Sequence, residues 1–530
     1  MRHIDTSRNT FSITTPLYYV NALPHIGSAY TTMAADAVAR FERLRGKSVL
    51  LITGTDEHGQ KIQRAALDNG LQPQEHCDRV AASFDALWQK LNIQYDRFSR
   101  TTAPRHEAIV KEFFGRVWHK GDIYLGQQKG WYCVSCEEFK EERDLLEGHR
   151  CPLHPNKEAE WRDEANYFFA FSKYQNQLEA LYKEQPDFIQ PTTRRNEVLS
   201  FVSQGLQDFS ISRVNVDWGF PVPVDPKHTI YVWFDALLGY ITALLDPDSE
   251  PTLENALKTW WPINFHLIGK DILRFHAVYW PAMLMSADIP VMEHVFGHGF
   301  LTKDGQKMGK SLGNTLDPVE LVNRYGADAI RYYFLKEIEF GKDGDFNEAR
   351  FIDIVNADLA NDLGNLLNRT LKMVQKYFDA RVPDVGEENT LAMNPLREIG
   401  IDLGDRVAQA YAALAFGEAC REIFTLIRAT NKFIDEQAPW SLYKQGNISK
   451  LKEVLYGSLE SVRLSAYLLS PIIPNISSDI YNQLGFSIDF NEKTFIKDSA
   501  PFATHAHWGT LPPNQILGNP KPVFARLEVG

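Results

Sequence analysis

The sequence lacks the features of membrane and secreted proteins. None of its apolar runs approaches the length of a membrane-spanning helix, and residues 1–8, Met-Arg-His-Ile-Asp-Thr-Ser-Arg, contain no apolar signal core. Its five cysteines are an odd number and three of them cluster, which favours metal binding in a reducing compartment over a set of disulfides. These absences predict a cytoplasmic protein with no membrane partner.

Positive charge is also scarce. With 56 Lys and Arg against 68 Asp and Glu, the net charge is −12, so any contact with RNA must use local basic patches. The rest of the composition, 44% apolar and 23% charged residues in a chain of 530, is typical of a large folded enzyme. Two or more domains are therefore expected.

A loop near the N-terminus has the surroundings of a nucleotide site. Residues 10–20 are rich in β-branched and aromatic side chains and predict a buried strand, and residues 24–28 read Pro-His-Ile-Gly-Ser. Helical spacing of apolar residues follows from Ala29, with Ser28 as the expected N-cap. His25 would then lie at a helix N-terminus, where free N–H groups favour phosphate. Taken alone, such a loop is more often a turn with a surface histidine.

A second apolar run, residues 49–52, leads to Asp56. Strand, glycine loop, helix and strand in this order are typical of one half of a Rossmann-like sheet, which binds ligands at the carboxyl ends of its strands. Asp56 lies at such an end, although a helix N-cap is a common alternative role for Asp.

A second loop, residues 307–311, reads Lys-Met-Gly-Lys-Ser and can place two cations on a triphosphate. A P-loop is excluded, because Gly305 and Gly309 are separated by three residues and not four. A dinucleotide fingerprint at residues 297–302 also fails, because Thr302 stands where its third glycine should be. The remaining alternative is a solvated loop rich in Lys and Gly.

The cysteine cluster has the spacing of a metal site. Cys133 and Cys136 are separated by two residues, and so are Cys151 and His154. Two such pairs can place three thiolates and one imidazole tetrahedrally around Zn²⁺. All four ligands come from the protein, so the site is expected to be structural, with one zinc per chain.

Together and in this order, the two loops resemble those of the class I aminoacyl-tRNA synthetases. The segment between the two halves of the predicted sheet is short, which excludes the large editing domain of the synthetases for valine, isoleucine and leucine. Residues 17–21, 231–240 and 269–280 resemble the methionyl-tRNA synthetases in particular, with an aromatic set suited to a thioether.

The resemblance implies a role for each matching position. The implied methionine-binding residues are Leu17, Tyr19, Asp56, Trp233, Ala236, Leu237, Tyr240, Asp271, Ile272, His276 and Trp280. The implied ATP-binding residues are His25, Gly27, Ser28, Lys307, Lys310 and Ser311, of which His25, Lys307 and Lys310 would be catalytic. Ser28 departs from the family, whose first loop usually ends in a second histidine. The Ser28 hydroxyl can still form a hydrogen bond with phosphate or ribose.

From about residue 351 the pattern becomes helical and predicts an α-helical bundle. The resemblance implies that this bundle binds the anticodon through Asn365, Arg369 and Trp440. Pro439 should end the preceding helix and leave Trp440 near the surface, although packing of Trp440 into the bundle is the alternative.

The predicted fold is α/β: a Rossmann-like parallel sheet split by a zinc-binding insertion and followed by a C-terminal helical bundle. The expected divisions are 1–115 and 226–296 for the two halves of the catalytic domain, 116–225 for the zinc-bearing insertion, 297–350 for a linker with the lysine loop, 351–510 for the anticodon-binding domain and 511–530 for a tail. The tail carries no further RNA-binding module, which favours a monomer.

The resemblance implies a methionine–tRNA ligase. Its substrates would be ATP with Mg²⁺, L-methionine, and the initiator and elongator methionine tRNAs. Three alternatives are a class I synthetase for cysteine, an inactive synthetase-like RNA-binding protein, and an adenylyltransferase that acts on a small molecule without tRNA. The intact His25, Asp56 and lysine loop argue against an inactive protein, and the helical bundle argues against the last alternative.

Overall fold

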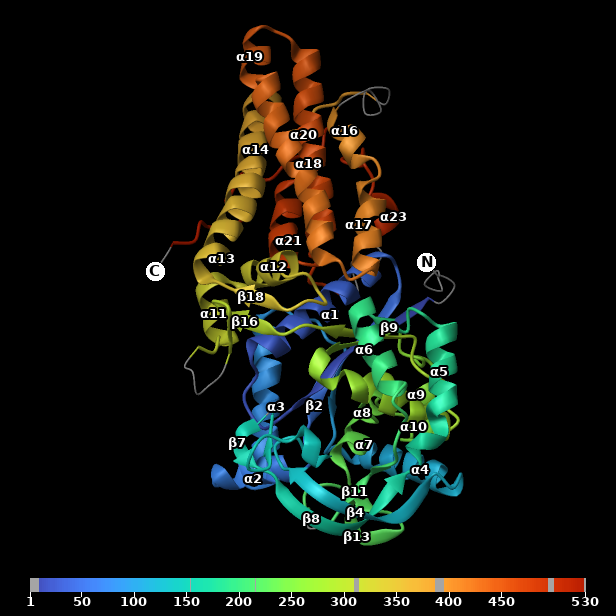
Figure 1. Cartoon of the computed structure of the whole chain (residues 1–530). Helices are drawn as coiled ribbons and strands as arrows, with labels where there is room; N and C mark the ends of the chain where they lie inside the picture. Colours follow the sequence, from blue (N-terminus) through green and yellow to red (C-terminus); the bar gives the residue numbers. More distant parts are fainter. Residues whose placement is uncertain are drawn as a thin grey trace.

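The structure, a computed structural model, describes residues 9–152, 154–214, 216–308, 314–386, 395–493 and 500–528. The molecule is elongated, with an α/β part at one end and a bundle of long helices at the other (Figure 1). Among these residues, no helix combines the length and the apolar composition needed to cross a membrane. The predicted fold class is confirmed, since a parallel sheet, an insertion with a cysteine cluster and a helical bundle follow one another.

The α/β part is built on a six-stranded sheet in the order β3-β2-β1-β14-β15-β9, and all its strand pairs are parallel. The strands are β1 (Thr10–Tyr19), β2 (Ser48–Asp56), β3 (Arg97–Arg100), β9 (Ile189–Gln190), β14 (Phe265–Gly269) and β15 (His294–His298). The chain leaves β1 toward β2 and returns later to β14 on the other side of β1. The switch point that binds ligands in such sheets therefore lies at the carboxyl ends of β1 and β14.

Helix α1 (Ile26–Leu44) lies between the sheet and the bundle. All its residues except Gly27 are buried, because one side packs on the sheet and the other on helices of the bundle. Phe41, for example, stacks on Tyr411 of the bundle with ring centroids 4.7 Å apart. The other helices of the α/β part are α2 (Gln60–Asp68), α3 (Pro73–Lys90), α4 (Pro104–His119), α7 (Val232–Ala236), α8 (Gly239–Thr242), α9 (Leu253–Leu257) and α10 (Trp280–Ser286).

The insertion is mostly antiparallel, and its two long strands lie at the end of the molecule farthest from the bundle (Figure 1). Its long strands β4 (Ile123–Cys133) and β8 (Glu160–Phe169) pair along their whole length. Around them lie β5 (Glu138–Lys140), β6 (Arg150–Cys151), β7 (His154–Glu158), β10 (Phe209–Ser210), β11 (Ser212–Arg213), β12 (Pro221–Val222), β13 (Asp225–Ile230), α5 (Gln175–Glu184) and α6 (Thr192–Val202). Strand β9 belongs to this stretch of sequence, yet it pairs with β15 at the edge of the catalytic sheet.

A small sheet joins the two ends of the molecule. It consists of β16 (Leu301–Lys303), β17 (Gln306–Lys307) and β18 (Gly344–Phe346), with α11 (Pro318–Tyr325) and α12 (Ala327–Glu337) beside it. The bundle follows with α13 (Glu348–Val355), α14 (Asn365–Phe378), α16 (Pro395–Gly400), α17 (Leu403–Ala412), α18 (Phe416–Gln437), α19 (Pro439–Lys444), α20 (Ile448–Leu469), α21 (Pro474–Gln483) and α23 (Phe502–His505). Two π-helical segments, Phe275–Tyr279 and Asn356–Gly364, were not predicted from the sequence.

A buried ion cluster fastens the bundle to the catalytic sheet. Asp36 of α1 binds both Arg40 and Arg331, with each N–O distance at 2.7 Å, and all three side chains are buried. Arg331 also donates to the carbonyl oxygens of Pro471 and Ile472, which lie between α20 and α21. Charges buried this deeply need such partners, so the two parts are held in one arrangement.

Candidate active site

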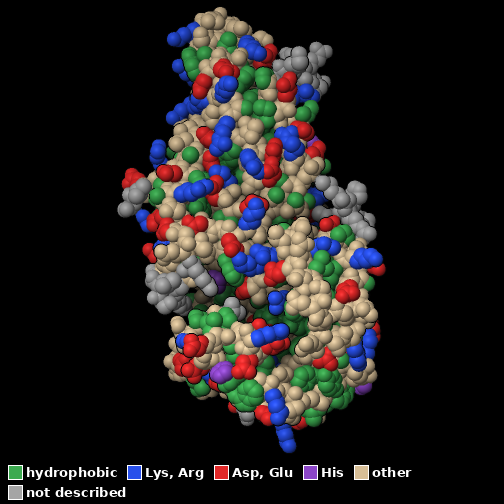
Figure 2. All heavy atoms as spheres, in the orientation of Figure 1, with side chains coloured by type: hydrophobic (Ala, Val, Ile, Leu, Met, Phe, Trp, Pro, Cys, Tyr) green, Lys and Arg blue, Asp and Glu red, His purple; other side chains and the backbone are tan. Residues whose placement is uncertain are grey.

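The candidate site lies at the carboxyl ends of β1 and β2. Tyr19 ends β1 and Asp56 ends β2, and the two are register partners in the sheet. Leu17 of β1 reaches Gly239, where an added Cβ would lie 2.3 Å from the Leu17 Cδ1 atom. On the face drawn in Figure 2, the lower half of the molecule is hollowed, with hydrophobic side chains inside the hollow.

The first loop starts α1 with the imidazole of His25. Its Nδ1 atom accepts hydrogen bonds from the backbone N–H groups of Gly27 and Ser28, at 3.1 and 3.4 Å, and the Ser28 hydroxyl accepts one from the His25 N–H. The expectation that Ser28 is the N-cap is therefore wrong: His25 caps the helix and Ser28 completes a capping box. A Cβ at position 27 would lie only 2.9 Å from the His25 ring, so glycine lets the ring fold over the helix start.

The lysine loop is described only in part. Strand β17 pairs with β16 and brings Lys307 next to Thr302, but the side chain of Lys307 is outside the description. Lys310 and Ser311 also lie outside the described residues. Their predicted roles stay predictions.

Asp56 is a buried carboxylate that accepts a hydrogen bond from the backbone N–H of His58 but leaves one oxygen without a partner among the described residues. It is 5% exposed, and none of the described residues forms a hydrogen bond with its Oδ1 atom. Burial raises the pKa of the Asp56 carboxyl well above its ordinary value, and the carboxylates of Asp235 and Glu137 add to the rise. A substrate ammonium group would supply the missing partner and favour the anion. Asp271, the other predicted polar residue, is exposed on a short 3₁₀ turn.

Asp235 is held by two histidines, which the sequence analysis missed. His58 Nδ1 and His106 Nε2 each lie 2.6 Å from one of its carboxylate oxygens, and all three residues are buried. Burial alone would raise the pKa of Asp235, but the two histidines outweigh burial and lower that pKa to about 2. Because Asp235 is part of α7, this cluster ties the predicted pocket residues Trp233, Ala236 and Leu237 to the loop after β2. No local pattern joins residues 58, 106 and 235.

The predicted aromatic residues cluster beside β14. His276 Nδ1 lies 3.0 Å from the Ile272 carbonyl oxygen and donates to it, so His276 Nε2 accepts from the Tyr240 hydroxyl at 2.8 Å. Burial lowers the pKa of His276 to about 4, which keeps the ring neutral. Trp233 stacks on Phe275 with centroids 3.9 Å apart. Trp280 lies deeper and contacts the rings of Phe113 and Trp261.

Two further residues of this region were missed. His266 of β14 is buried 4.5 Å from the Tyr240 ring centroid, and its Nε2 atom has no partner among the described residues. Glu137 directly follows Cys136 in the sequence, and its carboxylate accepts a hydrogen bond of 2.6 Å from the Tyr19 hydroxyl. Its other oxygen accepts from the backbone N–H of Lys61, at 2.9 Å. Glu137 therefore joins the cysteine cluster to the end of β1.

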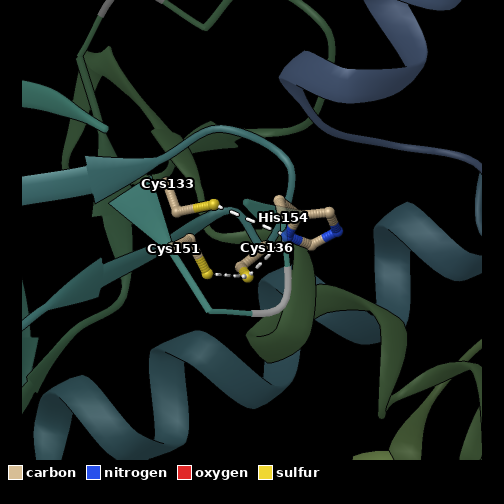
Figure 3. Close-up of side chains that lie close together, drawn as sticks. All are labelled: Cys133, Cys136, Cys151 and His154. Carbon is tan, nitrogen blue, oxygen red and sulfur yellow. Dashed lines mark hydrogen bonds between the residues drawn. The ribbon is translucent and has the colours of Figure 1, made fainter. Parts of the chain in front are cut away.

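The four predicted metal ligands converge on one point. Their ligand atoms lie within 4.8 Å of one another, so Cys133, Cys136, Cys151 and His154 could hold a metal ion (Figure 3). Cys136 Sγ is 3.6 Å from Cys151 Sγ and 3.3 Å from His154 Nδ1. A tetrahedral zinc site with bonds of about 2.0–2.3 Å needs ligand atoms roughly 3.5–3.8 Å apart, so the donor set and its size fit.

The predicted anticodon-binding residues belong to two helices of the bundle, α14 and α19, and α19 lies at its free end (Figure 1). Asn365 is exposed at the start of α14. Arg369, four residues later, binds the Asp435 carboxylate at 2.9 Å and the Asn431 carbonyl oxygen at 2.8 Å on α18. Trp440 follows Pro439 in α19 and is 46% exposed, so it is not a core residue of the bundle.

Comparisons with known proteins identify the family. Residues 11–159 and 145–371 match the model for tRNA synthetases class I (M), and residues 382–528 match that for the anticodon binding domain of methionyl tRNA ligase. Over 528 residues the chain is 71% identical to the methionine–tRNA ligase of Nostoc sp., covering 100% of this chain and 99% of the relative. It is 53% identical to the chloroplastic/mitochondrial enzyme of Arabidopsis thaliana, covering 98% of this chain and 83% of the relative.

Solved structures agree. Mycobacterium tuberculosis methionyl-tRNA synthetase in complex with methionyl-adenylate superposes with a TM-score of 0.90 at 41% identity, covering 98% of this chain and 100% of that one. The free form of that synthetase gives a TM-score of 0.84 at 37% identity, with both chains covered completely. With full-length relatives and both family models matched, the chain belongs to the methionyl-tRNA synthetase family of the class I tRNA synthetases.

Proposed function

We propose that this chain activates methionine with ATP to methionyl-adenylate and transfers it to the 3′ end of methionine tRNA, both initiator and elongator. The observation that carries the proposal is the buried carboxylate of Asp56 at the switch point of the sheet, one oxygen of which has no partner among the described residues. Asp56 lies one strand from the His25 loop, and His58, two residues later, binds Asp235 beside the pocket residues of α7. Family membership supports the same reaction.

In the first step, Asp56 holds the substrate ammonium. Leu17, Tyr19 and the residues on α7 enclose the thioether, together with Tyr240, Ile272, His276 and Trp280. The neutral His276 ring suits this uncharged side chain, because an imidazolium would have to be desolvated. The carboxylate of the amino acid then attacks the α-phosphate of ATP in line, and pyrophosphate leaves.

ATP enters as its magnesium complex, beside His25, Gly27 and the Ser28 backbone. The helix start of α1 favours negative charge there. His25, Lys307 and Lys310 stabilise the charge that develops on the phosphates, and Ser311 completes the loop. In the second step a ribose hydroxyl of the tRNA attacks the adenylate carbonyl and AMP leaves. Neither step needs a protein nucleophile, so positioning and charge stabilisation supply the rate.

The cysteine cluster binds one Zn²⁺ in this proposal. A bound zinc would supply structural stability only, since four protein ligands leave no open position. Through Glu137 and Tyr19 the cluster supports the amino-acid site. The five cysteines form no disulfide, which fits the proposed location in the reducing cytoplasm. We expect the chain to act there as a monomer.

The test is ATP–pyrophosphate exchange with each standard amino acid in turn. Methionine and close thioether analogues should be the substrates that drive exchange well. Strong exchange with cysteine, valine or isoleucine and none with methionine would overturn the proposed specificity.

A further inference from the structure

A pair of stacked tyrosines lies at the free end of the bundle. Tyr377 belongs to the last turn of α14 and Tyr443 to α19, and their ring centroids are 4.3 Å apart with 21° between the planes. Tyr377 packs partly against the core of the bundle. Tyr443 is 46% exposed, so one side of its ring lies on Tyr377 while much of the ring faces solvent. Tyr377 therefore holds the Tyr443 ring in place on one face, and the rest of that ring is open to solvent.

This pair belongs to the same two helices as the residues predicted to bind the anticodon. Trp440 precedes Tyr443 by three residues in α19, which places the two side chains on neighbouring positions of one helical face. Along α14, Asn365 and Tyr377 are twelve positions apart, a distance of about 18 Å. That distance is a few nucleotides of extended RNA. A loop whose anticodon reaches Asn365, Arg369 and Trp440 therefore has further nucleotides within reach of Tyr443.

The charges around the pair suit a polyanion. Helices α14 and α19 carry Arg369, Lys372, Lys376 and Lys444 and no acidic side chain, although the whole chain has a net charge of −12. The three lysines are exposed, and Lys376 Nζ lies 5.5 Å from the Tyr377 ring centroid. Lys and Arg side chains are visible at this end of the molecule in Figure 2.

Two acidic groups of α18 near the pair are already in ion pairs, whereas Asp379, at the end of α14, is exposed and has no ion pair among the described residues. At the end of α18, Asp435 binds Arg369 at 2.9 Å and Glu436 lies 3.6 Å from Lys432. The lysines of α14 and α19 are therefore left to face solvent beside an open aromatic ring. Unpaired bases on aromatic rings with cations at the phosphates are the common mode of single-stranded RNA binding.

We propose that Tyr443, backed by Tyr377, stacks on an unpaired base of the tRNA outside the contacts of Asn365, Arg369 and Trp440, with Lys372, Lys376 and Lys444 at the adjoining phosphates. This inference rests on the proposed function, which supplies the RNA. Every base has an aromatic face, so this contact adds affinity without reading the base. Specificity stays with the other three residues.

The decisive variants are Tyr443→Leu and Tyr443→Phe. Leucine keeps apolar bulk against Tyr377 but loses the flat ring, whereas phenylalanine keeps both. The Kd of an anticodon stem-loop of methionine tRNA should rise about tenfold for Tyr443→Leu and stay within about twofold for Tyr443→Phe. Methionine-dependent ATP–pyrophosphate exchange and the melting temperature should not change in either variant.

Salt dependence tests the lysines separately. Replacing Lys376 by Gln should reduce the slope of log K against log salt for the same stem-loop by about 0.7–0.9, the value for one phosphate contact. Lys111→Gln, at an exposed lysine of α4 in the catalytic part, is the matched control and should leave the slope unchanged.

An unchanged Kd for Tyr443→Leu, or an equal loss in Tyr443→Leu and Tyr443→Phe, would overturn the stacking platform. A lower melting temperature with unchanged RNA affinity would show that the pair only packs α19 on α14. The proposed function fails by a different result, the absence of methionine-dependent exchange in the unmodified chain, so the two failures are distinguishable.

Discussion

The amino-acid site and the free end of the bundle use the same kinds of side chain in opposite ways. At the amino-acid site Trp280 is fully buried and Tyr240 is 2% exposed, whereas Trp440 and Tyr443 at the bundle end are each 46% exposed. The buried set includes Asp56, His266 and Trp280, each with a polar atom that has no partner in the described part of the chain. The exposed set comes with surface lysines.

This difference shows how each region selects its ligand. A small amino acid can be enclosed completely. A molecule without an ammonium group would then bind weakly, because the buried Asp56 carboxylate would lack a counter-ion. An RNA loop is too large to enclose. Exposed rings can stack on its bases while cations bind its phosphates, and each such contact adds affinity but little sequence specificity. Each prediction below should disturb one region and leave the other unchanged.

The largest expected effect is loss of the metal. Cys151→Ser should reduce bound zinc from one per chain to none, since apparent binding energies of structural zinc sites are about 10–16 kcal/mol and depend on every thiolate. Affinity for the anticodon stem-loop should stay the same. Metal analysis and stem-loop binding check both statements.

The matched control for this substitution is Cys77→Ala, which removes a thiol outside the cluster and should keep the zinc. Unmodified protein that contains no zinc after purification without chelators would disprove the assignment.

Next in size is the loss of the ammonium partner. Asp56→Ala should lower kcat/KM for methionine by about 2–5 kcal/mol, or roughly 30- to 5,000-fold, because the substrate charge stays buried without its counter-ion. Asp271→Ala removes the other predicted carboxylate, on the short 3₁₀ turn after β14, and should cost less than about threefold. Pyrophosphate exchange measures kcat/KM for both variants. A larger decrease for Asp271→Ala would indicate that Asp271, and not Asp56, binds the substrate ammonium.

A smaller effect belongs to the bundle end. Trp440→Ala should lower kcat/KM for tRNA charging by roughly ten- to a hundredfold, in line with a stacking energy of about 1–3 kcal/mol. Pyrophosphate exchange and the melting temperature should stay nearly unchanged, because the indole is exposed. Aminoacylation kinetics and thermal unfolding are the measurements.

Trp161→Ala is a suitable control for Trp440→Ala, since this indole of the insertion is 59% exposed and should have no part in anticodon stem-loop binding. Parallel losses in pyrophosphate exchange and tRNA charging for Trp440→Ala would defeat the anticodon role.

The smallest effect concerns one hydroxyl. Tyr240→Phe removes the donor to His276 Nε2 and should raise KM for methionine about fivefold, the cost of about 1 kcal/mol for one buried hydrogen bond. Tyr30→Phe removes a buried hydroxyl that has no partner among the described residues, so it should change little. Equal effects of the two substitutions on KM would argue against a role for the Tyr240–His276 bond.

Local patterns predicted much of this molecule. Three features depend only on residues that are close together in the sequence: the strand before His25, the helix after it and the Cys133–His154 cluster. The structure contains all three as predicted. The exposure of Trp440 could also be predicted, because proline ends a helix by its own chemistry.

The parts that were missed depend on contacts across long stretches of chain. His58, His106 and Asp235 meet only after the sheet has formed, and Glu137 reaches Tyr19 across 118 positions. A lone His or Glu carries no periodic signal, so such pairs are invisible in the sequence. The N-cap was misassigned because histidine is not among the usual capping residues, although its Nδ1 atom accepts the same hydrogen bonds.

The near-complete burial of α1 has a consequence for how the molecule can come apart. A helix that is covered on all sides has no route to local opening, so its amide hydrogens should exchange with solvent only when the sheet and the bundle separate. Cutting the chain ahead of the bundle would uncover Phe41 and the charged Arg40 on α1, the helix that His25 begins. The catalytic part and the RNA-binding part are therefore expected to melt as one cooperative unit, and a catalytic half expressed alone should aggregate.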